Sequence, residues 1–158
     1  ATYGVEEQDL TSALLKLHIR ESGSVEVQQW VTAQDDPLPV WEIQEMELTN
    51  ALRLKVFWGE LTEAEAEAQI VHVRDRKRRG LYFHPEIHRS DLMDTFRRLS
   101  TATMRLGCRT IDVLHVACAL QLAPAAFVSF DTRRCTLARE AGLSVLGAPP
   151  PVAPDSAG

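Results

Sequence analysis

Apolar residues recur with a helical period over most of the chain. Leu48, Leu52 and Val56 are spaced four residues apart, so they fall on one face of a helix. This spacing predicts a helix over residues 43–58, which Gly59 ends by adopting the left-handed conformation that suits glycine. A wide apolar face of this kind indicates a helix packed against the core of the protein.

Two more helices follow from capping residues and closing glycines. Thr62 and Glu65 form a capping-box pattern, in which each side chain binds a backbone N–H of the first turn, and this helix should end before Gly80. A further helix is expected over residues 90–106, closed by Gly107. The middle of the chain is therefore predicted to be mainly helical.

The segment 107–120 combines an apolar helix with one acid. We expect Thr110 to be the N-cap, and the residues that follow are apolar nearly all round, which predicts a buried helix. Asp112 lies in the first turn of this helix. The helix dipole favours a carboxylate there, but burial without a partner is costly. A cationic or hydrogen-bonding partner is therefore expected, and a metal ion is one candidate.

Short apolar runs between the helices predict strands. They are residues 38–41, 81–84, 127–130 and 144–146. Strands that alternate with helices in a chain of this length indicate an α/β fold, a three-layer α/β/α sandwich around a short central parallel sheet. Asp131 directly follows one of these strands, where sites gather in open α/β sheets.

Length and composition indicate an ordinary globular domain. The chain has 158 residues, 45% of them hydrophobic and 25% charged, and we expect one domain over residues 1–147. Residues 148–158 are rich in proline and small residues and are predicted to be a disordered tail. No apolar run approaches the length of a membrane span.

Cysteine spacing and net charge narrow the chemistry. Cys108, Cys118 and Cys135 are odd in number and widely spaced, which favours buried, reduced thiols over ligands or disulfides and indicates a reducing cytoplasm. The formal charge of −5 argues against a surface that coats nucleic acid broadly. It leaves room for a local basic patch beside an acidic site.

The remaining evidence lies in the order of four segments, residues 11–17, 47–53, 107–117 and 127–131. Together these segments resemble the PIN-domain nucleases, in particular the VapC-like toxins of bacterial toxin–antitoxin pairs. The resemblance spans residues 9–146. It implies an endoribonuclease that depends on Mg²⁺ or Mn²⁺ and acts through a cluster of four acids.

Three of the four acids implied by the resemblance are Glu47, Asp112 and Asp131. Ser12 and Ser129 match small hydroxyl positions that support such a site by hydrogen bonding. Carboxylates alone suit Mg²⁺, which is a hard cation that prefers oxygen ligands. We expect Asp112 and Asp131 to be ligands, and Glu47 to be a ligand or to position the attacking water.

The fourth acid departs from the family pattern. Leu10 occupies the position where the family has aspartate, and Asp9 lies one residue earlier. In a strand, a shift of one residue turns a side chain to the opposite face, although a bulge or loop can bring Asp9 back to the site. The alternative is a PIN-like domain with impaired catalysis that binds protein or RNA.

Basic residues near the acids are candidates for substrate binding. Arg109, Arg133 and Arg134 flank the acids in the sequence and are expected to contact RNA phosphates. His115 lies three residues after Asp112, and a structural role beside a polar neighbour is favoured over that of a general base. The resemblance further implies a cognate antitoxin as partner, and a homodimer.

Overall fold

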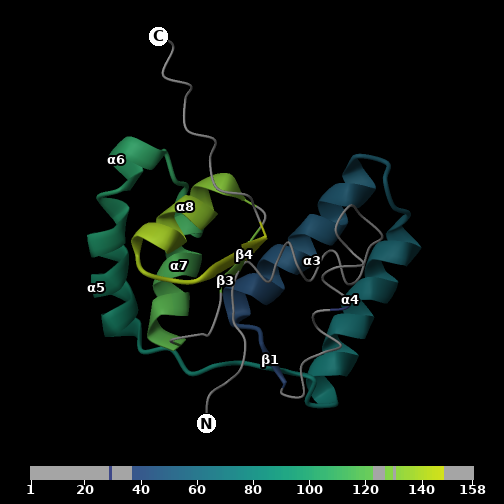
Figure 1. The fold of residues 1–158 in the computed structure, drawn as a ribbon. Helices are drawn as coiled ribbons and strands as arrows, with labels where there is room; N and C mark the ends of the chain where they lie inside the picture. Colours follow the sequence, from purple (N-terminus) through teal and green to yellow (C-terminus); the bar gives the residue numbers. More distant parts are fainter. Residues whose placement is uncertain (1–28, 30–36, 123–126, 130, 148–158) are drawn as a thin grey trace.

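A computed structural model describes residue 29 and residues 37–122, 127–129 and 131–147. Helices dominate this part of the chain (Figure 1). The helices are α3 (Glu42–Phe57), α4 (Glu63–Arg78), α5 (Arg89–Ser100), α6 (Thr103–Leu106), α7 (Thr110–Leu122) and α8 (Thr132–Glu140). The strands are β1 (Leu38–Pro39), β2 (Tyr82–Phe83), β3 (Phe127–Ser129) and β4 (Val145–Gly147).

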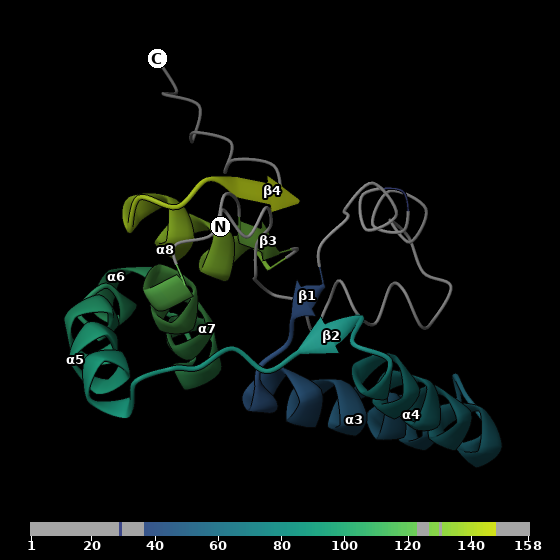
Figure 2. The same ribbon diagram turned by 90° about the horizontal axis from the view of Figure 1, so that it is seen from below.

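The predicted three-layer sandwich around one central sheet is wrong for the part of the chain that the structure describes. The strands form two separate two-stranded parallel sheets, β1 with β2 and β3 with β4 (Figure 2). Each strand is only two or three residues long. Pro39 also lacks the N–H that would extend the ladder of β1. The apolar runs therefore do form parallel strands, but these are too short to build a layered sheet.

The first packed unit joins α3 and α4 to the β1–β2 pair. The register places Leu38 opposite Tyr82, and both are buried. α3 contributes Leu48 and Leu52, as its apolar spacing predicts, and α4 contributes Ile70. The expected capping box of α4 is present, with the Glu65 N–H donating to the Thr62 hydroxyl at 3.2 Å and the Thr62 N–H donating to Glu65 at 2.7 Å.

The second packed unit gathers α5, α7, α8 and the β3–β4 pair on the other side of the molecule (Figure 1). Phe127 of β3 is fully buried and packs with Val116 of α7 and Leu137 of α8. The apolar sequence of α7 is explained by this position, because much of the helix is covered. The two packed units meet where α3 approaches α7.

One predicted helix is divided in two. The helix expected over residues 90–106 is α5 followed by the single turn of α6, with a break at Thr101 and Ala102. Gly107 closes α6 with a φ of 65°, a left-handed conformation that glycine adopts without strain. This turn directs the chain into α7.

Cys108, Cys118 and Cys135 are buried and in the reduced thiol form, as the sequence predicts. Among the described residues, no helix has both the length and the apolar character needed to cross a bilayer. The predicted tail, residues 148–158, lies outside the described residues, as do Asp9, Leu10 and Ser12.

Candidate functional site

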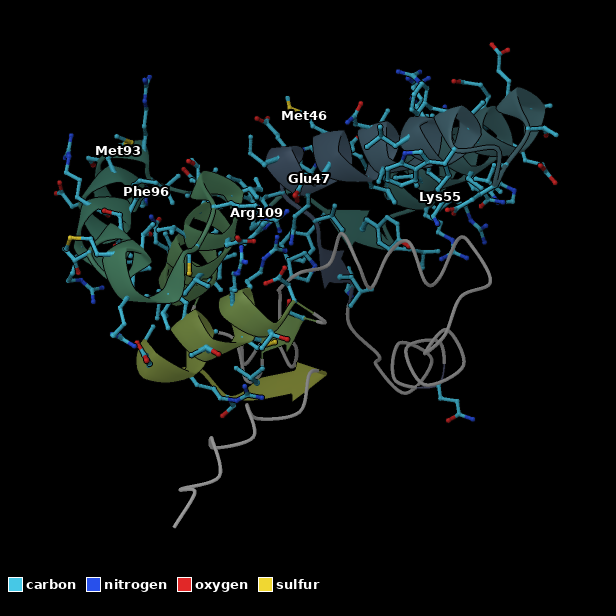
Figure 3. All side chains as sticks on the ribbon, turned by 90° about the horizontal axis from the view of Figure 1, so that it is seen from above. Met46, Glu47, Lys55, Met93, Phe96 and Arg109 are labelled. Carbon is cyan, nitrogen blue, oxygen red and sulfur yellow. The ribbon has the colours of Figure 1, made fainter. Side chains whose placement is uncertain are left out.

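The candidate site lies at the junction of the two packed units, beside the first turns of α7 and α8. Figure 3 labels Glu47 on α3 and Arg109 just before α7, where the two helices approach each other. Arg109 donates hydrogen bonds to both Asp112 and Asp131. Glu47 contacts His115, which lies three residues after Asp112 on α7, so α3 brings Glu47 to the same helix.

Asp112 is the buried centre of the site. α7 begins at Thr110, and the carbonyl of Arg109 accepts the first N–H groups of the helix, so Arg109 rather than Thr110 takes the capping position. Asp112 accepts a hydrogen bond from the Arg109 backbone N–H at 2.8 Å. Its side chain has no exposed surface. The carboxylate that the sequence places in an apolar helix is therefore buried, and it needs partners.

Two arginines supply those partners. Arg109 donates through Nε to Oδ2 of Asp112 at 3.1 Å and through Nη2 to Oδ1 at 3.1 Å. Arg134 donates through Nε and Nη2 to Oδ1 at 3.1 and 2.9 Å. Burial raises the pKa of Asp112, but the hydrogen bonds from Arg109 and the bonds and charge of Arg134 outweigh it and hold the pKa below its ordinary value.

Asp131 joins the same network at the end of β3. It caps α8, because its Oδ1 accepts the Arg134 N–H at 3.0 Å. Its Oδ2 accepts a hydrogen bond from Nη2 of Arg109 at 3.3 Å, so Arg109 bridges Asp131 and Asp112. The predicted supporting residue Ser129 is buried nearby, and its hydroxyl accepts the Asp131 N–H at 3.1 Å.

Glu47 is held by a histidine of α7. Its Oε2 lies 2.5 Å from Nε2 of His115, whose side chain is almost fully buried. The ring of Trp41 meets the His115 ring edge to face, with 6.0 Å between the ring centroids. His115 is therefore a structural partner of Glu47, the role that the sequence favours. Glu47 keeps 25% of its side-chain surface exposed and is not an unconstrained surface glutamate.

The sequence predicts Arg134 only as a phosphate contact, whereas the structure places it beside Asp112. The signal was available, because Arg134 shares a helical face with Leu137 and Ala138, which are both buried. Arg133 does not join the bonds to Asp112 that Arg134 makes; it donates through Nη1 to the carbonyl of Gly107, two residues before Arg109, at 3.3 Å. The other predicted site residues, Asp9 and Ser12, lie outside the described residues.

The arrangement does not fit a Mg²⁺ or Mn²⁺ ion held by Glu47, Asp112 and Asp131. The donor chemistry is suitable, because such ions take carboxylate oxygens. Yet Asp112 already accepts five hydrogen bonds from Arg109 and Arg134. Among the described residues, no three His, Cys, Asp or Glu side chains are placed to share a metal ion. Two guanidinium groups supply the positive charge in its place.

No protein-family profile matches the chain, and no curated protein matches it.

Proposed function

We propose that the protein is an endoribonuclease that cleaves RNA phosphodiester bonds at the junction of α3, α7 and α8. The observation that carries the proposal is that Arg109 joins Asp112 to Asp131, while Glu47 reaches the same helix, α7, through His115. These three acids are the ones that the resemblance to PIN-domain nucleases implies. A carboxylate, a histidine and an exposed arginine at one place are groups that can move a proton and bind a phosphate.

Glu47 is the residue best placed to act on the attacking water. Its carboxylate is partly exposed and is held by His115, so its position is fixed while one side still faces solvent. Arg109 keeps 61% of its side-chain surface exposed and is the cation best placed to contact a phosphate. In this proposal, Asp112 and Asp131 position Arg109, and Arg133 is a second candidate for phosphate binding.

The remaining parts of the proposal follow from the resemblance. It implies a VapC-like toxin of the cytoplasm that pairs with a cognate antitoxin, forms a homodimer and requires Mg²⁺ or Mn²⁺. Because the residues as arranged do not fit such an ion, the roles proposed for Glu47 and Arg109 do not depend on it.

A second candidate function is RNA binding without cleavage. Saturation of Asp112 by two arginines favours it, because a carboxylate with five donors has little capacity left for a ligand. Leu10, at the position where the family has aspartate, points in the same direction. This candidate predicts that the protein binds RNA and leaves it intact.

Replacing Glu47 with glutamine tests the ribonuclease directly. We expect Glu47→Gln to slow cleavage of a fluorogenic single-stranded RNA by about 10²-fold or more, because glutamine cannot accept a proton. The assay is run in buffer with Mg²⁺, with Mn²⁺ and with EDTA. Glu45→Gln is the matched control, since Glu45 lies on the same helix but bonds to Lys77 and His84 outside the site.

We expect Glu45→Gln to cleave RNA at the rate of the unmodified protein. Cleavage by Glu47→Gln at that same rate would contradict the role of Glu47. If the unmodified protein binds the RNA in all three buffers but leaves it intact, the ribonuclease proposal is wrong and the binding function is favoured.

A further inference from the structure

The two arginines that neutralise Asp112 differ sharply in how they are held. Arg134 has only 5% of its side-chain surface exposed and lies in the packed interior. Arg109 has 61% exposed. Within the described part of the chain, the side-chain hydrogen bonds of Arg109 go to the two carboxylates, two to Asp112 and one to Asp131. Arg134 is therefore a fixed part of the core, whereas Arg109 can turn out into solvent without leaving a cavity.

Release of Arg109 would change the acids in a specific way. Oδ2 of Asp131 accepts a bond from Arg109, and Oδ2 of Asp112 accepts two, from the side chain and the backbone N–H of Arg109. Loss of the guanidinium would thus free carboxylate oxygens on two residues that it now bridges. Arg134 would still neutralise Oδ1 of Asp112. The Arg134 side chain is bonded to Asp112, so the charge of Asp131 would be less well neutralised, and repulsion between the two carboxylates would favour binding of another cation.

We propose that Arg109 is a built-in counter-ion that closes the Asp112–Asp131 pair to divalent cations. An ion can enter only if it displaces the Arg109 guanidinium, and this competition lowers its apparent affinity. The poor fit of the site to Mg²⁺ or Mn²⁺ then depends in part on one exchangeable side chain, Arg109, beside the fixed contribution of Arg134. This inference deepens the proposed ribonuclease function and rests on it, because the same acids are involved.

The test measures binding of Mn²⁺ alone, without RNA, by isothermal titration calorimetry. We expect Arg109→Gln to bind Mn²⁺ at least about tenfold more tightly than the unmodified protein, because a competing positive charge is removed from beside the two acids. Arg105→Gln is the matched control. It removes the same charge from an exposed arginine. Arg105 donates two hydrogen bonds, of 2.9 and 2.6 Å, to the single carboxylate of Glu140. We expect this control to bind Mn²⁺ as the unmodified protein does.

Arg109→Lys gives a second, milder variant in case the glutamine variant fails to fold. Lysine keeps the charge but cannot bridge two carboxylates with a planar fork, so Mn²⁺ should again bind more tightly than to the unmodified protein. Equal affinity of the folded Arg109 variants and Arg105→Gln overturns the inference. Because no RNA is present, tighter Mn²⁺ binding supports the counter-ion role even if the protein fails to cleave RNA.

Discussion

Asp112→Asn is expected to lower the free energy of unfolding by about 3 kcal/mol. The substitution keeps the shape of the side chain but removes its charge. Arg134, which is almost fully buried, then keeps its positive charge without the Asp112 carboxylate. Removal of one partner of a buried ion pair typically costs about 3–5 kcal/mol, and the retained amide oxygen places this variant at the lower end.

Urea denaturation followed across a range of pH checks this expectation. The folded pKa of Asp112 is lowered, so its stabilising contribution is present above the ordinary aspartate value of about 3.9 and is lost as the pH falls through the folded pKa. The difference in unfolding free energy between the unmodified protein and Asp112→Asn should therefore be largest at neutral pH and should become smaller in acid. Asp94→Asn is the control, because Asp94 pairs with Arg97 on the surface and should contribute less than about 1 kcal/mol. The buried ion pair of Asp112 would be contradicted if Asp112→Asn lost no more unfolding free energy at neutral pH than Asp94→Asn.

Phe127→Ala is expected to cost about 3–5 kcal/mol of unfolding free energy. Phe127 has no exposed surface and is the largest fully buried side chain among the described residues. Truncation removes its transfer free energy and leaves a cavity between α7 and α8 that the short β3–β4 pair cannot close. Phe57→Ala is the matched control, because 83% of Phe57 is exposed and its loss should change stability by less than about 0.5 kcal/mol. Similar midpoints of urea denaturation for the two variants would contradict the placement of Phe127 in the core.

The helices could be predicted from the sequence because their signals are local. The spacing of Leu48 and Leu52, and the capping pair Thr62 and Glu65, depend on neighbours within one or two turns. The number of sheets could not be predicted, because it depends on which distant strands pair. Four short apolar runs are compatible with one sheet or with two. Pro39, which cannot extend a ladder, was the available sign that β1 would stay short.

The acids of the site could be predicted more easily than their partners. Asp112 stands out because a carboxylate in an apolar helix demands a cation, and this expectation is confirmed. Arg109 is a local partner, three residues before Asp112, but its bridge to Asp131 and the pairing of Arg134 with Asp112 depend on how α7 and α8 pack. His115 follows the same logic, since its bond to Glu47 joins α7 to α3. Contacts between elements depend on packing, which the pattern of a single helix does not specify.

The central claim is that the gathered acids act as one unit on RNA. The most direct test is the single-turnover cleavage rate of Glu47→Gln, of Asp131→Asn and of the double variant, where asparagine retains the ability to cap α8. Residues that act as a unit are not additive in their effects, so the double variant should be about as slow as the slower single variant. The claim would be contradicted if the rate losses of the two single variants multiply in the double variant. It would also be contradicted if the single variants cleave at the rate of the unmodified protein.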